Sequence, residues 1–172
     1  MNLGLEENKI RIVTDSLDKS RVLWYNKYMK TIRDSQRSKV YCAENVISGK
    51  RFDDIKELRE YVKRICNSSF WKKLNGYPSV LVQDGRRRRK ACAYDRYSIS
   101  MPVWARSEAV TLHELAHTLV NFNKKPVADH GREFVKMFLK LVHHYMGKEE
   151  YILLRDSFKE HNVKYSTRKE NL

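Results

Sequence analysis

Apolar residues recur at helical spacing in several segments of the chain, with polar residues between them. The clearest segment begins at Asp53, where either Asp53 or Asp54 can cap a helix. Its apolar face consists of Ile55, Leu58, Tyr61, Val62 and Ile65. A less regular pattern predicts a helix over 14–32. Further helices are expected from about Ser107 to Asn121, from about His130 to Met146, and from Lys148 to about Glu160.

Short runs of β-branched and alternating apolar residues predict a small sheet. The expected strands are Ser79–Gln83, Lys90–Tyr94 and Tyr97–Val103, with Asp95-Arg96 as a hairpin turn between the last two. Lys39–Ile47 also favours β-structure and leads into a turn at Ser48–Lys50. The order of these elements predicts an α+β fold in which a small, mostly antiparallel sheet packs on the later helices.

Length and composition favour one globular domain over a disordered chain, because 41% of the 172 residues are hydrophobic and 33% are charged. We expect the domain to cover residues 14–165, after a loosely ordered segment at 1–13 and before a frayed polar tail at 166–172. No apolar run reaches the length of a membrane span, and two glutamates near the N-terminus argue against a secretory signal. We therefore expect a cytoplasmic protein without a membrane partner.

The cysteines agree with a reducing compartment. Cys42, Cys66 and Cys92 are dispersed and form no CxxC pair. This spacing argues against a disulfide framework and against a zinc ribbon built from cysteines.

Basic residues outnumber acidic ones by 35 to 21, which gives a formal net charge of +14 at pH 7. Such a surplus favours polyanionic partners, nucleic acid first. The densest run consists of Arg86, Arg87, Arg88, Arg89 and Lys90. We expect this run at a hairpin turn, where it is either a solvated loop or a contact to phosphates with little base specificity. Tyr94 and Trp104 are candidates for stacking on unpaired bases, although aromatic residues are more often part of the core.

Residues 113–117 read His-Glu-Leu-Ala-His inside an apolar segment expected to be helical. Because positions i and i+4 are one helical turn apart, His113 and His117 project from one face and can bind the same metal ion. Glu114 points to a different side, from which its carboxylate reaches a metal-bound water without binding the metal. A zinc ion lowers the pKa of that water to about 7, and Glu114 can then accept its proton.

A catalytic zinc ion generally has three protein ligands and an open position. The metzincin pattern requires Gly and His where this chain has Val120 and Asn123. His130 is the better third ligand, because a short connection lets the next helix fold back and set it over the first pair. Ligands of the thermolysin type, Glu133 or Glu149, are the alternative. The remaining histidines, which lie too far along the chain or are expected to be exposed, are His143, His144 and His161.

The HELAH motif together with His130-Gly131-Arg132-Glu133-Phe134 resembles the SprT-like zinc metallopeptidases, whose pattern is HExxH followed by HGxxF. The chain is similar in particular to a small family of metallohydrolases predicted in actinobacteria and their phages, over about Arg33 to Val163. This resemblance implies a compact zincin fold in a bacterial or phage-infected cell. It also implies one zinc ion held by His113, His117 and His130, with Glu114 as catalytic acid and base. The chain lacks the zinc ribbon of many SprT-like proteins, so DNA recognition by that module is not implied.

The leading interpretation is a zinc-dependent hydrolase, most simply a peptidase that cleaves a protein or peptide associated with nucleic acid. A second interpretation is a repressor-cleaving peptidase of the phage type, although such enzymes often carry a further histidine where this chain has Asn121. A third is a zinc-stabilised, basic nucleic-acid-binding protein without catalysis. Glu114 argues against the third, because a structural site is closed by four protein ligands and has no use for a nearby carboxylate.

Two parts of an active site have only weak sequence signals. Candidates for stabilising an oxyanion are Tyr97, Tyr145 and Arg132. The strand Tyr97–Val103 is either the edge of the cleft, where an extended peptide can add by main-chain pairing, or a strand of the core.

Overall fold

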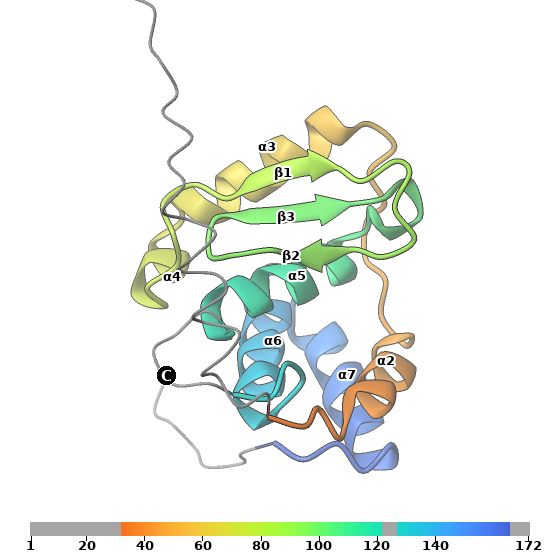
Figure 1. The fold of residues 1–172 in the computed structure, drawn as a ribbon. Helices are drawn as coiled ribbons and strands as arrows, with labels where there is room; N and C mark the ends of the chain where they lie inside the picture. Colours follow the sequence, from red (N-terminus) through yellow and green to blue (C-terminus); the bar gives the residue numbers. More distant parts are fainter. Residues whose placement is uncertain (1–31, 122–126, 166–172) are drawn as a thin grey trace, which may run out of the picture. The chain divides into compact units, whose positions relative to one another are not determined.

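The fold combines a small sheet with helices that pack below and beside it (Figure 1). The computed structural model describes residues 32–121 and 127–165, which belong to one unit spanning Ile32–Leu172. The elements are α2 (Arg37–Glu44), α3 (Ile55–Asn67), α4 (Ser69–Lys73), β1 (Leu81–Asp84), β2 (Cys92–Ala93), β3 (Ser98–Met101), a 3-10 turn (Val103–Ala105), α5 (Glu108–Val120), α6 (Arg132–Tyr145) and α7 (Lys148–Glu160). The helix expected over 14–32, the segment 1–13 and the tail 166–172 lie outside the described residues, apart from Ile32.

The α+β class is confirmed, but the sheet is mixed and not mostly antiparallel. Its strand order is β1-β3-β2. Strand β1 runs parallel to β3, with Val82 opposite Ile99, whereas β2 runs antiparallel to β3, with Ala93 opposite Ile99. After β1 the chain crosses to the opposite edge of the sheet and forms β2 there. Strand β3 then lies between β1 and β2. The expected hairpin turn at Asp95-Arg96 therefore does join two neighbouring strands.

Strand β3 lies in the centre of the sheet, and each of its residues is buried. A central strand has neighbours on both sides, so the interpretation of Tyr97–Val103 as the edge of a cleft is wrong. The edges of the sheet are β1 and β2.

Lys39–Glu44 belong to helix α2 and the next three residues follow its end, so the expectation of a strand over Lys39–Ile47 is wrong. Val40 and Ala43 lie one helical turn apart and are both fully buried. Helix α2 packs against α7, where the Ser157 hydroxyl donates a hydrogen bond of 2.9 Å to the Ala43 carbonyl. Packing of this face thus overrides the preference of Val and Tyr for strands.

Helices α3, α5, α6 and α7 agree with the periodicity, and the expected caps of α3 and α5 are present, whereas the short helix α4 was not predicted. Asp54 caps α3 by accepting the Lys56 N–H, and Ser107 caps α5 by accepting the Val110 N–H. Gly147 separates α6 from α7 with a φ of 109°, a conformation that favours glycine. None of the described helices is long and apolar enough to cross a bilayer.

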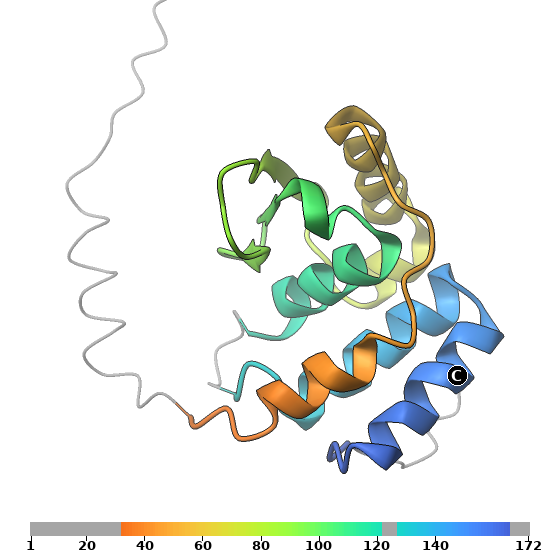
Figure 2. The same ribbon diagram turned by 90° about the vertical axis from the view of Figure 1, so that its right-hand side faces the viewer.

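Helix α5 lies between the sheet and α6, and it is buried along almost its whole length (Figures 1 and 2). Strands β2 and β3 contact it on one side, and α6 packs on the other. Polar side chains of α5 therefore lie inside the protein, where an unpaired polar group is costly. The contacts made by the buried side chains of His113, Glu114 and His117 therefore determine which function helix α5 can have.

Candidate metal centre

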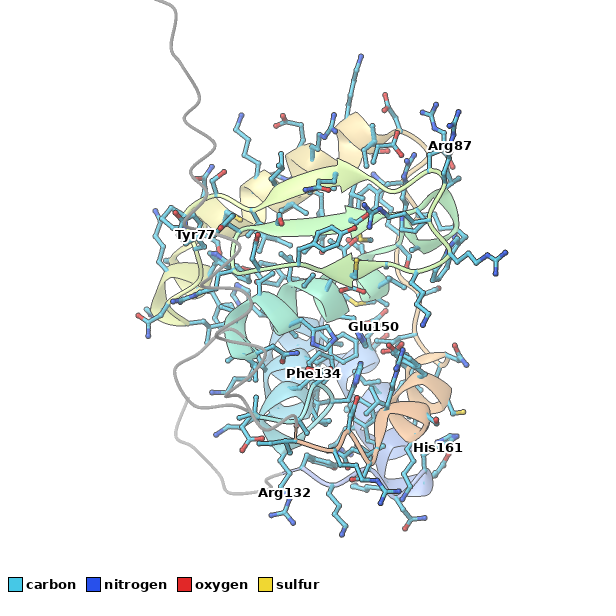
Figure 3. The ribbon with its side chains drawn as sticks, viewed as in Figure 1. Tyr77, Arg87, Arg132, Phe134, Glu150 and His161 are labelled. Carbon is cyan, nitrogen blue, oxygen red and sulfur yellow. The ribbon has the colours of Figure 1, made fainter. Side chains whose placement is uncertain are left out.

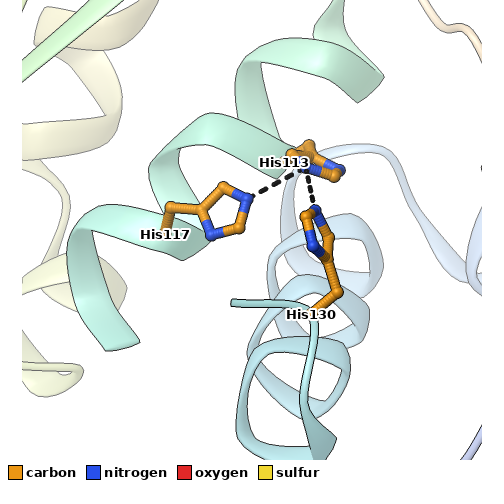
Figure 4. A group of neighbouring side chains, drawn as sticks. All are labelled: His113, His117 and His130. Carbon is orange, nitrogen blue, oxygen red and sulfur yellow. Dashed lines mark hydrogen bonds between the residues drawn. The ribbon is translucent and has the colours of Figure 1, made fainter. Parts of the chain in front are cut away.

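Three buried histidines come together from helix α5 and from the segment before α6 (Figure 4). His113 and His117 lie one turn apart on α5, and His130 immediately precedes the start of α6. Nε2 of His113 lies 3.1 Å from Nε2 of His117 and 3.3 Å from Nε2 of His130. The three ligand atoms lie within 4.8 Å of one another. The structure thus brings together the three residues that the sequence singled out.

The spacing of these nitrogens suits a tetrahedral ion. With metal–nitrogen bonds of about 2.1 Å and tetrahedral angles, two ligand nitrogens lie about 3.4 Å apart. The Nε2 separations from His113 to His117 and to His130, 3.1 and 3.3 Å, are close to this value. Two of the three pairs thus have the separation that one ion requires, all three ligand atoms lie within 4.8 Å of one another, and the cluster could hold one metal ion.

Two carboxylates hold the outer nitrogens of the histidine rings. Glu44 Oε2 lies 2.6 Å from Nδ1 of His113, and Asp34 Oδ2 lies 2.7 Å from Nδ1 of His130. When each Nδ1–H donates to its carboxylate, each Nε2 carries a lone pair directed into the cluster. The Nε2 atoms of His113 and His130 lie 3.3 Å apart, and their lone pairs repel each other unless a cation lies between them.

The carboxylates escaped the sequence analysis. Glu44 lies in α2, which was expected to be a strand, and Asp34 lies just before it. They are 69 and 96 residues away from their histidine partners. No local motif connects positions so far apart, so only the packed fold identifies them.

Burial favours the neutral, metal-binding form of His113 and His117. It lowers the pKa of His113 to about 3, and the neighbouring His130 lowers it as well. The pKa of His117 lies well below its ordinary value for the same reason, with further lowering by His113 and His130. Burial raises the pKa of Glu44 to about 8, an effect that the charge of His130 opposes.

An aromatic side chain from α6 covers the inner side of the cluster. The Phe134 ring stacks on His117 at 4.3 Å and meets the rings of His113 and His130 edge to face at 4.8 and 5.0 Å. The Gln36 side-chain amide donates a hydrogen bond of 2.7 Å to the backbone carbonyl of His130. These contacts fix the ring positions, which a metal site needs.

Glu114 is buried beside the cluster without belonging to the set of ligand atoms. Its carboxylate faces strand β2, where the backbone N–H of Ala93 donates a hydrogen bond to it. Burial raises the pKa of Glu114 to about 8; the hydrogen bond from Ala93 lowers it, and the charge of Glu44 raises it. A carboxylate with such a pKa can exchange a proton near neutral pH.

The other candidate ligands are outside the cluster within the described residues; they are Glu133, Glu149, His143, His144 and His161. His144 stacks on Phe70 at 3.8 Å, and Nδ1 of His161 lies 2.9 Å from the Ser157 carbonyl oxygen. At the position where repressor-cleaving enzymes often carry a histidine, the Asn121 amide donates to Asp129.

The three residues considered as oxyanion donors lie elsewhere. The Tyr145 hydroxyl is 2.7 Å from the Ser68 hydroxyl, and Tyr97 packs against Tyr77 at 5.5 Å. Arg132 is exposed and points away from the helices (Figure 3). Within the described part of the chain, none of these three side chains contacts a histidine of the cluster.

The basic run lies on the loop between β1 and β2, and its five side chains are exposed. This loop joins two strands that are separated by β3, so the expectation of a hairpin turn is wrong. Arg87 points away from the sheet (Figure 3). The Arg88 guanidinium lies over the Tyr94 ring, 5.0 Å from its centre, and Arg86 pairs with Asp84.

Comparisons with known proteins add no family to this description: no family model, no curated protein and no solved structure matches the chain. The resemblance to zinc metallopeptidases therefore depends on the HELAH and HGREF residues and on the geometry around them. What this geometry supports is a buried three-histidine cluster, consistent with a zincin-like HExxH site, that could hold a metal ion.

Proposed function

We propose that the protein is a zinc-dependent hydrolase and that its substrate is a peptide bond. The observation that carries this proposal is the convergence of three buried histidines, with Nε2 of His113 at 3.1 and 3.3 Å from Nε2 of His117 and His130. Carboxylates orient two of the rings, and Glu114 lies beside them. A purely structural zinc site would need a fourth protein ligand, and the cluster among the described residues has three.

Zinc is the ion that fits this donor set best. Imidazole nitrogens also bind copper, nickel and iron. Three histidines with an open fourth position are, however, an arrangement of catalytic zinc. Zinc bound there would supply a Lewis acid that acidifies water to a pKa near 7 and polarises a carbonyl group.

Glu114 would act as the base and then as the acid of the reaction. Its carboxylate accepts a proton from the attacking water, whose oxygen forms a bond to the carbonyl carbon. The same proton then passes from Glu114 to the leaving nitrogen as the C–N bond breaks. A pKa of about 8 before a metal binds shows that the carboxyl group holds a proton readily in this environment. A cation beside it favours the ionised form that the first step needs.

Asp34 and Glu44 would keep the ligand rings in place, which leads to a prediction about metal affinity. Asp34→Asn and Glu44→Gln are each expected to weaken zinc binding about 10- to 100-fold, because the amides cannot accept the Nδ1–H in the same way as a carboxylate. Competition with a chromophoric chelator measures the affinity. Asp156→Asn, at an exposed carboxylate on α7, is the matched control. If both site variants bind zinc as tightly as this control does, Asp34 and Glu44 do not hold the ligand rings in place.

The proposed function is tested by metal analysis combined with cleavage of a broad peptide library. We expect one zinc ion per chain, cleavage that stops when a chelator removes it, and recovery when zinc is added back. Zinc without cleavage of any peptide would favour the alternative of a zinc-stabilised binding protein. A chain that binds no zinc would contradict both.

The basic loop supports a second proposal, that nucleic acid brings the protein to its substrate. The supporting observation is the exposure of Arg86–Lys90 together with the Arg88–Tyr94 contact. Guanidinium groups bind phosphates without reading sequence, and an exposed tyrosine offers a surface on which a base can stack.

The salt dependence of binding tests this second proposal. The logarithm of the affinity for duplex DNA should fall with the logarithm of salt concentration by about 0.9 per phosphate contact. Replacing Arg86, Arg87, Arg88 and Arg89 with Ser should reduce this slope by about three to four units. Removing equal charge from exposed lysines at positions 56, 63, 72 and 73 is the control. If both quadruple variants bind alike, the loop is only a solvated segment.

A further inference from the structure

Tyr41 borders the histidine cluster from helix α2. Its ring lies 4.9 Å from the His130 ring, edge to face, and 5.7 Å from the His113 ring. Tyr41 is 39% exposed, whereas each of the three histidines is buried. The tyrosine therefore lies on the side from which a molecule in solution reaches the cluster.

The neighbour of the Tyr41 hydroxyl determines what that hydroxyl can do. The Arg37 side chain, one turn earlier on α2, forms a hydrogen bond with Tyr41, and its guanidinium lies 5.5 Å from the ring centre. Arginine has only donors, so it must donate to the phenol oxygen. The phenol proton is then free to be donated to another group.

Among the described residues, no group accepts a hydrogen bond from the Tyr41 hydroxyl, and two carboxylates of the site influence it electrostatically. The charges of Glu114 and Glu44 raise the pKa of Tyr41, in addition to the larger effect of burial. A phenol is protonated at neutral pH in any case. The Tyr41 hydroxyl is thus a hydrogen-bond donor on a side chain that contacts the histidine cluster.

We propose that Tyr41 is a catalytic residue of this site, which donates a hydrogen bond to the carbonyl oxygen of the substrate as that oxygen becomes negatively charged. Arg37 is the positioning residue that directs the phenol proton. This inference rests on the proposed hydrolase function and adds to it the group that stabilises the oxyanion. Among the described tyrosines, Tyr41 has ring contacts with the clustered histidines, whereas Tyr97 and Tyr145 contact other groups.

The test uses the full chain loaded with cobalt(II), whose visible absorption reports ligand binding, and acetohydroxamate as the probe. Tyr41→Phe should weaken acetohydroxamate binding about 10-fold, because a hydrogen bond to a charged group is lost. Hydrolysis of any peptide found in the library should lose kcat about 100-fold, with KM changed little. Tyr97→Phe, at another exposed tyrosine, should leave both quantities unchanged.

A double-mutant cycle tests the part of Arg37. Arg37→Met alone should weaken acetohydroxamate binding several-fold, Arg37→Lys should restore part of the loss, and Arg37→Met should add nothing in the Tyr41→Phe background. Additive losses would overturn the positioning role, because they would mean that Arg37 acts independently of Tyr41.

The outcomes separate this inference from the function on which it rests. Wild-type protein that binds no cobalt contradicts the metal site itself. Cobalt binding with equal acetohydroxamate affinity in wild type and Tyr41→Phe overturns the inference and leaves the metal site standing. Cobalt-loaded wild type that binds no acetohydroxamate also overturns it, since a site closed to this ligand is closed to a carbonyl group.

Discussion

Glu114→Gln is expected to reduce peptide hydrolysis at least ~100-fold while the zinc content stays at the wild-type level. The amide has nearly the shape of the carboxylate but cannot take a proton from water. Glu114 is not among the ligand atoms of the cluster, so its replacement leaves the three histidines in place. Single-turnover cleavage of the best library peptide, with metal analysis of the same sample, measures both quantities.

Glu133→Gln is the matched control for this experiment. Glu133 is an exposed glutamate in the first turn of α6, close in sequence to His130. The Glu133→Gln variant should hydrolyse the peptide as fast as wild type does. Equal activity of wild type and Glu114→Gln would exclude Glu114 as the base, whatever the metal content.

His130→Ala is expected to remove tight zinc binding altogether. The variant keeps the pair on α5 but loses the third ligand, and two imidazoles alone bind zinc weakly. It also leaves the Asp34 carboxylate without its ring partner. Since zinc at 100 times its dissociation constant stabilises a folded protein by about 2.7 kcal/mol, zinc should raise the Tm of wild type by about 5–10 °C. The Tm of His130→Ala should not respond.

His143→Ala is the control for the loss of one histidine. His143 lies exposed on α6 and contacts Tyr151, so its removal should change neither zinc binding nor the response of Tm. A zinc-induced rise in the Tm of His130→Ala as large as that of wild type would contradict the ligand assignment.

The sequence was informative where the relevant physics is local. Helical spacing and a side-chain cap fix the register of α5, and this register alone puts His113 and His117 on one face. His130 was predictable because a short connection limits where the next helix can start. The caps Asp54 and Ser107 mark helix starts by hydrogen bonds within three residues.

The parts that could not be predicted depend on contacts between distant segments. Val40 and Tyr41 of α2 favour a strand, and the packing of this segment against α7 decides for a helix. The error mattered, because α2 carries Glu44 and Tyr41 to the cluster. In the same way, the parallel pairing of β1 with β3 follows from where the loop after β1 leads, which no periodicity records.

The position of α2 has a consequence for how the protein folds and for how a metal ion bound at the cluster would be released. Helix α2 is synthesised before α7, the described helix against which it packs. Because α7 ends more than about 100 residues later, at about 5–20 residues per second α2 waits for roughly 5–20 s. Once docked, α2 is a short helix held at one side of the unit, and such an element can open without global unfolding. Opening would withdraw Glu44 from His113 and uncover the cluster. Metal exchange in the folded protein should then be limited by the rate at which α2 undocks, and the amide hydrogens of α2 should exchange at a similar rate.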